Sequence, residues 1–289
     1  MQNGNLKLAI QKKGRLTDKS LDLLRKCGIE IETYSNRLFV TARNYSLDLL
    51  FLRDDDIPEY VQDGVADLGI VGEDVLFEKQ TDTSIVKKLN YGRCRLMIAI
   101  PEKDELKEIK ELNGKRIATS HPVILEEFLS KNKIEAKTID INGSVEIAPS
   151  LGVADYICDI VSTGNTLKLN KLKKSFTVFE SEAVLIGNKM LDENPEKKSL
   201  LRDLLRRFDS VQTAKDSKYL MMNIPKKSLK KISEIIPSIK SPTVLPLLDE
   251  DLLAVHAVIP GERFWEIIDN LKKEGATGIL LMPIENMIP

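Results

Sequence analysis

The sequence predicts an α/β protein with a two-lobed core and a small C-terminal domain of different architecture. Three observations support this prediction. Short apolar runs alternate with helical patterns over most of the chain, which is typical of parallel sheets covered by helices. The 289 residues correspond to about two domains at roughly 150 residues per domain. The composition becomes charged at residues 101–112, which indicates a boundary between two lobes.

The first lobe is predicted from strand-like runs separated by turns. Residues 6–10 form the first run. The helix that follows starts at Thr17 as its N-cap, places Leu21 and Leu24 on one face and ends at Gly28. The further strands expected from apolar runs are at residues 37–42, 47–52, 66–71 and 94–101.

The second lobe is expected between residues 101 and 183. An apolar run at residues 176–188 is expected to carry the chain back to the first lobe, and apolar residues recur with helical spacing from Pro195 to Val211. The first lobe therefore consists of residues 1–100 together with 184–215. The strands expected in the second lobe are at residues 115–120, 138–141 and 156–161.

Residues 216–289 show a strand–helix–strand pattern that occurs twice. The first copy spans residues 218–247, with a helix starting at Pro225, and the second spans 252–283, with a helix ending at Gly275. This βαββαβ order is the ferredoxin-like split unit, which ACT-like domains share. Such a module is a candidate for ligand sensing or for assembly, and the fold alone does not decide between them.

The charge balance and the cysteines exclude several classes of function. There are 43 basic and 44 acidic residues, which argues against a general binder of nucleic acid or anionic membranes. The chain has no apolar run that would span a bilayer and no secretory signal pattern, so we expect a cytoplasmic protein. Cys27, Cys94 and Cys158 are far apart and only two histidines exist, so buried thiols are favoured over disulfides or a zinc site.

The segment richest in functional signals is residues 144–172. A buried strand ends near Asp159, and the turn STGNT at residues 162–166 opens a helix. Ligands of parallel sheets bind at the carboxyl ends of strands, and Gly164 with neighbouring hydroxyls and free N–H groups suits a phosphate monoester. Asp159 is placed to accept hydrogen bonds from sugar hydroxyls or to reach a magnesium ion. The alternative is that these residues form only a helix N-cap turn.

An acid followed by Thr-Gly-x-Thr resembles the loop with which phosphoribosyltransferases hold the 5-phosphate and ribose of phosphoribosyl pyrophosphate. Over essentially its whole length the chain is similar to the long form of ATP phosphoribosyltransferase, the first enzyme of histidine biosynthesis. The segments that carry the resemblance are QKKGRL (11–16), RDDDIPEYVQDGVADLGIVGEDV (53–75), GRCRL (92–96), NGKRIATS (113–120), NGSVEIAP (142–149), CDIVSTGNTL (158–167), SKYLMMN (217–223) and SPTVLPL (241–247).

The resemblance implies transfer of the phosphoribosyl group to N1 of ATP, with release of pyrophosphate in the presence of Mg²⁺. The nucleophile belongs to the substrate, which agrees with a sequence that offers no catalytic triad. The resemblance also implies lobes like those of type II periplasmic binding proteins and a regulatory C-terminal domain. Histidine is the expected feedback inhibitor, AMP a further effector, and a homohexamer the expected assembly.

By resemblance, the loop after the strand at 156–161 receives the phosphoribosyl group. Catalytic roles are expected for Asp159, Glu146 and Arg15, and Glu146 and Asp159 are the candidate metal ligands. Glu146 has the alternative role of capping a helix. The residues expected to bind phosphoribosyl pyrophosphate are Asp159, Ser162, Thr163, Gly164, Asn165, Thr166 and Leu167.

ATP or pyrophosphate is expected at the ends of other strands. Arg93 and Arg95 lie two apart in a strand and therefore share a face, while Cys94 points away from them. The acids at 54–56 are expected to favour the start of a helix. A solvated basic loop is the alternative for residues 12–15. The residues expected to bind ATP are Lys12, Arg15, Gly72, Glu73, Asp74, Arg93 and Arg95.

The effector pocket is expected in the C-terminal domain. His256 is expected to be a strand residue rather than a ligand. For most of the candidates, the alternative is that they only form ordinary turns. The residues expected to bind histidine are Asn223, Ser241, Thr243, Gly275 and Ala276.

A second class of function is a non-catalytic ligand-binding or sensor protein. Two α/β lobes joined by crossing strands also resemble solute-binding proteins, and the small domain would then sense an amino acid. Such receptors are usually exported, and the lack of a signal pattern argues against this class. A catalytically silent regulatory paralogue is a variant of the same alternative.

Overall fold

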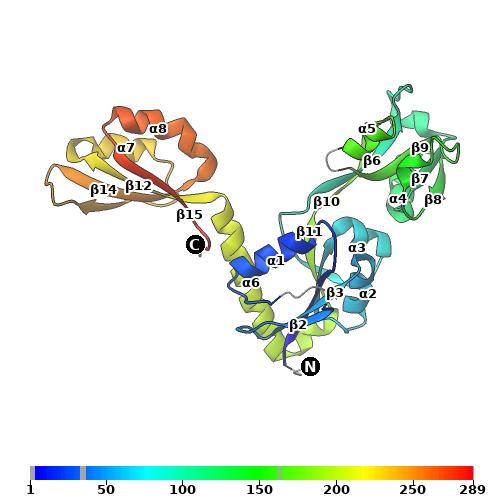
Figure 1. Cartoon of the computed structure of the whole chain (residues 1–289), viewed down its shortest axis with the longest axis horizontal. Helices are drawn as coiled ribbons and strands as arrows, with labels where there is room; N and C mark the ends of the chain where they lie inside the picture. The colour runs from blue at the N-terminus through cyan, green and yellow to red at the C-terminus, as the bar shows by residue number, and fades with distance from the viewer. Residues whose placement is uncertain (1–3, 33–36, 162–163, 289) are drawn as a thin grey trace. The chain divides into compact units, whose positions relative to one another are not determined.

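The computed structural model describes residues 4–32, 37–161 and 164–288 (Figure 1). The described chain forms three sheets of six, five and four strands. It divides into two compact units, one built from residues 1–22 and 29–201 and the other from residues 23–28 and 202–289. No described helix is long and apolar enough to cross a membrane.

The first sheet has the order β2-β3-β1-β4-β11-β5. Strand β1 runs parallel to β3 and β4, while β11 is antiparallel to β4 and to β5. Strands β1 and β4 are almost entirely buried, as expected where helices cover both faces of a parallel sheet. The elements of this lobe are β1 (Leu6–Gln11), α1 (Thr17–Lys26), β2 (Phe39–Thr41), β3 (Leu47–Leu52), α2 (Ile57–Gln62), β4 (Leu68–Gly72), α3 (Glu73–Lys79), β5 (Ser84–Lys88) and β11 (Ala183–Gly187).

The second sheet has the order β10-β6-β9-β7-β8. Strand β6, which the charged stretch at 101–112 places in the predicted first lobe, pairs with β9 and β10, so the second lobe starts near residue 94 rather than 101. The expected return run is β10 followed by β11, which pairs in the first sheet. The elements are β6 (Cys94–Pro101), β7 (Arg116–Thr119), α4 (Pro122–Lys131), β8 (Lys137–Asp140), β9 (Tyr156–Val161), α5 (Asn165–Leu169) and β10 (Leu172–Ser181).

The C-terminal sheet has the order β13-β14-β12-β15, all antiparallel, which is the ferredoxin-like topology that the repeated pattern predicts. One face of the sheet packs against α7 and α8 around Leu220, Val255 and Leu271. The two units divide within the helix α6, not at its end. The elements are α6 (Pro195–Lys215), β12 (Ser217–Pro225), α7 (Leu229–Ile235), β13 (Thr243–Pro246), β14 (Leu252–Pro260), α8 (Phe264–Lys273) and β15 (Thr277–Pro283).

The sequence therefore predicts the α/β class, the two-lobed core and the ferredoxin-like domain correctly. One helix start differs in detail. Thr17 lies inside α1, not before it, because its hydroxyl donates to the Gln11 carbonyl oxygen at 3.0 Å and holds the preceding turn against β1. The acids at 54–56 form a 3-10 turn that leads into α2, as expected.

A half-buried ion pair joins α6 to the first sheet. Lys197 Nζ lies 2.8 Å from both carboxylate oxygens of Asp67, and the backbone N–H of Lys7 donates to the same carboxylate at 2.9 Å. The two charged side chains are only 18% and 12% exposed. Loss of the cation would leave a largely buried carboxylate without its partner.

We predict that Lys197→Met lowers the free energy of unfolding by about 3 kcal/mol, because breaking a buried pair strands one charge. Urea denaturation at pH 7 measures this. Lys215→Met, on the exposed last turn of the same helix, is the control and should change stability by less than about 0.5 kcal/mol. Equal stability of the two variants would contradict the role given to the pair.

Candidate active site

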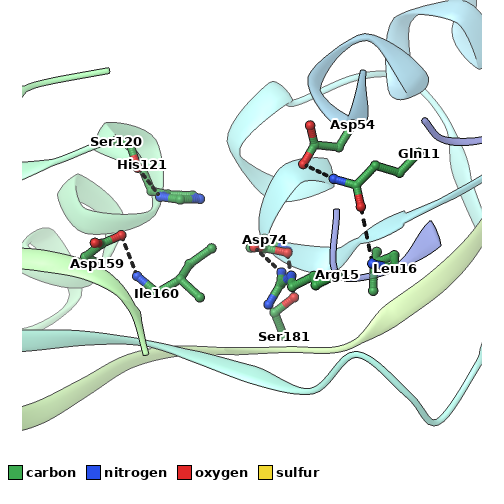
Figure 2. A network of polar contacts seen from close by, with 10 residues as sticks. All are labelled: Gln11, Arg15, Leu16, Asp54, Asp74, Ser120, His121, Asp159, Ile160 and Ser181. Atoms are coloured by element: carbon green, nitrogen blue, oxygen red, sulfur yellow. Dashed lines mark hydrogen bonds and ion pairs between the residues drawn. The ribbon is translucent and has the colours of Figure 1, made fainter. Parts of the chain in front are cut away.

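The turn after β1 is fixed by the side chain of Gln11. Its amide Nε2 donates to Asp54 Oδ2 at 2.9 Å, and its Oε1 accepts from the Leu16 backbone N–H at 3.2 Å (Figure 2). Gly14 has φ +145°, and a Cβ there would lie within 2.5 Å of the Gln11 amide. The turn therefore needs glycine at this position. It carries the exposed residues Lys12 and Arg15.

Arg15 is held by a buried carboxylate. Arg15 Nη2 lies 2.9 Å from Asp74 Oδ2, and the Asp74 side chain is 2% exposed. The hydroxyl of Ser181, at the end of β10, donates to Asp74 Oδ1 at 2.7 Å and accepts from the Asp74 backbone N–H at 3.1 Å. Burial is the largest single influence on the pKa of Arg15 and lowers it, but Asp74 and Cys94 together raise the pKa above its ordinary value. Asp74 therefore positions Arg15 and has no oxygen directed to solvent.

A cavity of about 760 Å³ lies beside this group and holds both expected arginines. Each has an acidic partner, since Arg95 Nε donates to Glu180 Oε1 at 2.9 Å and Arg93 Nε lies 3.8 Å from Glu182 Oε2. Both arginine side chains are exposed, so these pairs are weak and open to exchange for phosphate. Cys94, expected to point away, also lines the cavity. The remaining lining residues are Glu73, Lys88, Met97, Val161, Lys174 and Ser181.

Glu73 and Gly72 are less open to a ligand than the sequence suggests. Glu73 Oε1 lies 2.9 Å from Lys88 Nζ. Gly72 is needed because a Cβ there would lie 2.0 Å from Asp74 Oδ1. Both residues therefore shape the start of α3, and Glu73 also contributes to the cavity wall.

Asp159 lies near the carboxyl end of β9, half-buried and without an ion pair among the described residues. Burial raises the pKa of its carboxyl above the ordinary value and nearby Glu146 adds to this, whereas the Ile160 N–H, which donates to Oδ1 at 2.7 Å, and His121 oppose it. In Figure 2 the His121 ring extends from the Asp159 side of the view toward Asp74 and Arg15. The Asp159 carboxylate can therefore accept further hydrogen bonds.

Gly164 directly precedes α5, and its φ of +84° favours glycine. A Cβ at Gly164 would lie 2.8 Å from Lys174 Cε. Asn165 and Thr166 are exposed, whereas Leu167 is buried in the lobe core and anchors the helix. Ser162 and Thr163 lie outside the described residues.

Glu146 lies in a 3-10 turn at Val145–Ile147 and is half-buried. The N-cap position of this turn is Ser144, so Glu146 is not its cap. Within the described part of the chain, no group of three or more His, Cys, Asp or Glu residues is arranged as a metal site. All three cysteines are buried and free, as expected.

The histidine-site candidates fall into two groups in the C-terminal unit. Asn223 in β12 lies beside the start of β15, and its Oδ1 is buried without a hydrogen-bond partner. Gly275, with φ +89°, and the buried Ala276 end α8 near the same strand. Thr243 lies in the edge strand β13, with Ser241 just before it, and β14 separates β13 from β12. The structure therefore does not bring all five together.

His256 is a strand residue, as predicted. It lies in β14, and its Nδ1 is 2.9 Å from the Tyr219 hydroxyl. That contact pairs Nδ1 of His256 with the Tyr219 hydroxyl within the sheet. His256 therefore needs no ligand to explain its position.

These features define a class of protein. The two α/β lobes present cations and the Asp159 carboxylate, which has no ion pair in the described chain, at the ends of their strands, and all three cysteines are buried. A site of this composition suits an enzyme that transfers a group between phosphorylated substrates by orienting them.

Comparison with known proteins identifies the family. The model of the ATP phosphoribosyltransferase family matches residues 53–210, and the model of the C-terminal domain of that family matches residues 214–286. The ATP phosphoribosyltransferase of Bacteroides thetaiotaomicron is 50% identical over 98% of this chain and 99% of the relative. That of Cytophaga hutchinsonii is 47% identical over 98% of each chain. The chain belongs to the ATP phosphoribosyltransferase family, in its long form with the C-terminal domain.

A solved structure agrees with this assignment. The ATP phosphoribosyl transferase (HisG:HisZ) complex from Thermotoga maritima contains a chain that matches 71% of this one and 98% of its own length, with a TM-score of 0.59 and 32% identity. The protein is therefore an ATP phosphoribosyltransferase, the enzyme of the first step of histidine biosynthesis. A purely ligand-binding protein, the alternative weighed from the sequence, is not supported.

Several residues at the site carry no signal that sequence reasoning detected. Gln11 lies in a segment that carries the family resemblance, and Ser181 lies in a predicted strand run. Their hydrogen-bond partners, Asp54 and Asp74, are distant in the chain. For Asp54 the sequence predicts only a place at a helix start. The Glu78 contacts likewise depend on tertiary structure.

We predict that Asp74→Asn lowers kcat/KM by about tenfold to a hundredfold, because Arg15 loses a charged partner worth about 1.5–3 kcal/mol. Ser181→Ala should reduce it less, since the ion pair remains. Steady-state pyrophosphate release with ATP and phosphoribosyl pyrophosphate measures both. Wild-type kinetics in Asp74→Asn would show that this carboxylate does not position Arg15 for catalysis.

Proposed function

We propose that the segment between β9 and α5, together with the first turn of α5, binds the phosphoribosyl group. Asp159 carries this proposal, because it is half-buried at a strand end and pairs with no cation among the described residues. Its carboxylate would accept hydrogen bonds from the ribose hydroxyls. The 5-phosphate would lie against Gly164, Asn165 and Thr166, with Ser162 and Thr163 as the remaining candidates.

ATP and the departing pyrophosphate are assigned to the first lobe and the crossing strands. Lys12 and Arg15 on the turn after β1 would contact phosphates, and Arg93 and Arg95 would exchange their glutamate partners for them. The adenine N1 is the nucleophile, so the protein's task is to hold two polyanions in line and to stabilise charge on the leaving group. Both effects can contribute several kcal/mol.

A magnesium ion fits the second lobe. Asp159 and Glu146 are half-buried carboxylates close enough to raise the pKa of Asp159 through charge repulsion. Mg²⁺ in enzymes is commonly bound by one or two carboxylates, with substrate phosphates and water completing the shell. The two residues would hold the ion, which when bound neutralises the pyrophosphate oxygens. Glu146 and Asp159 would also orient the ribose.

The domains are assigned accordingly. The first sheet with α6 forms the lobe for ATP, the second sheet forms the phosphoribosyl lobe, and residues 216–289 bind histidine as feedback inhibitor. The proposal also includes AMP as a further effector, a homohexamer and a cytoplasmic location. Membership of the family supports these elements.

We predict that Asp159→Asn and Thr166→Ala each lower kcat/KM for phosphoribosyl pyrophosphate by about tenfold or more, because each removes a hydrogen bond that involves a charged group. Pyrophosphate release measures this. Asp140→Asn, at the exposed end of β8 in the same sheet, is the control and should behave as wild type. If Asp159→Asn retains full efficiency, the phosphoribosyl group binds elsewhere.

For the effector site we predict that Asn223→Ala weakens histidine binding and inhibition by about tenfold while uninhibited kcat stays unchanged. The buried and unsatisfied Oδ1 of Asn223 would be the acceptor for the ligand. Calorimetry with histidine and inhibition curves measure the effect. Unaltered inhibition would remove Asn223 from the pocket.

A further inference from the structure

Helix α3 of the first lobe contacts the second lobe through two consecutive residues. The Phe77 ring packs against the Phe179 ring of β10 with the centroids 5.3 Å apart. Glu78 Oε1 accepts from the Val123 backbone N–H at 2.9 Å, and Oε2 accepts from the Ile124 N–H at 3.1 Å. One carboxylate therefore binds two backbone donors of α4.

The sequence of α4 explains why it needs this carboxylate. Its N-cap residue, His121, makes no side-chain capping bond, and Pro122 has no N–H. The next two N–H groups have no acceptor within the helix, as is general for a first turn. A carboxylate satisfies both and interacts favourably with the positive end of the helix. The cap of α4 thus comes from the other lobe.

The opposite end of α3 holds Arg15. Asp74, in the first turn of α3, is the carboxylate that binds Arg15 and Ser181. The helix covers residues 73–79, a length of about 10 Å. One short helix therefore connects the cation of the first lobe to the start of α4, where His121 lies near enough to Asp159 to affect its charge.

We propose that Glu78 is a positioning residue for phosphoribosyl transfer. Its carboxylate sets the start of α4, and with it the Asp159 side of the second lobe, relative to Arg15 on the first. The inference rests on the proposed phosphoribosyl site. Because Arg15 and Asp159 lie on different lobes, a shift between the lobes would misalign the reacting atoms while each residue keeps its contact with substrate. Such misalignment lowers turnover more than binding.

The test compares two variants that each lose a helix cap. Glu78→Gln keeps the size of the side chain and one acceptor oxygen, but places an amide NH₂ against the second backbone donor. Asn194→Ala removes the Oδ1 that accepts from the Glu196 and Lys197 N–H groups at 3.1 Å, at the start of α6. Full-length proteins are assayed below their melting temperatures. Calorimetry gives the stoichiometry of phosphoribosyl pyrophosphate binding, and kcat is expressed per binding-competent site.

We expect Glu78→Gln to lower kcat by about tenfold or more, with KM for both substrates within about twofold of wild type. Asn194→Ala should lose thermal stability to a similar degree yet keep its kcat. An unchanged kcat in Glu78→Gln, a loss confined to KM, or an equal loss of kcat in Asn194→Ala would each overturn the proposal. Failure of the phosphoribosyl site is distinguishable, since it would appear as wild-type kinetics in Asp159→Asn whatever Glu78→Gln does.

Discussion

The buried carboxylate of Asp74 is the constraint on which the arrangement of the site depends. A carboxylate with 2% of its side chain exposed is costly unless it is paired and hydrogen-bonded. Arg15 and Ser181 supply this pairing, one from the turn after β1 and the other from the end of β10. Asp74 itself opens α3. Asp74 thereby holds together three segments that are far apart in the sequence: the turn after β1, the start of α3 and the end of β10.

The charged pairs of the site differ in how deeply they are buried. Asp74 is buried, so breaking its pair with Arg15 would leave a buried charge without a partner, whereas the pairs of Arg93 and Arg95 with glutamates are exposed and cost little to exchange. Asp159 has no cation beside it in the described chain, and burial raises the pKa of its carboxyl. This distribution suits a transferase that binds two phosphorylated substrates and whose nucleophile comes from one of them.

The sequence predicts most of the strands, because apolar runs and turn residues are local signals. It also predicts the ferredoxin-like domain from a repeated pattern. The sequence pattern places β6 in the wrong lobe, because an apolar run does not specify which sheet the strand joins. Within the site, the strand end at Asp159 and the turn at Arg15 are predicted positions. The Asp74–Ser181 bond spans 107 residues and the Glu78 contacts about 45, and no local pattern encodes such pairings.

The central claim is that the segment between β9 and α5 receives the phosphoribosyl group. Hydrogen–deuterium exchange of the full-length protein with phosphoribosyl pyrophosphate and Mg²⁺ tests it most directly, because bound phosphate protects the backbone N–H groups it contacts. The account predicts new protection in residues 159–169 with phosphoribosyl pyrophosphate and none there with histidine alone. Unchanged exchange in this segment at saturating substrate, with protection elsewhere in the core, would contradict it.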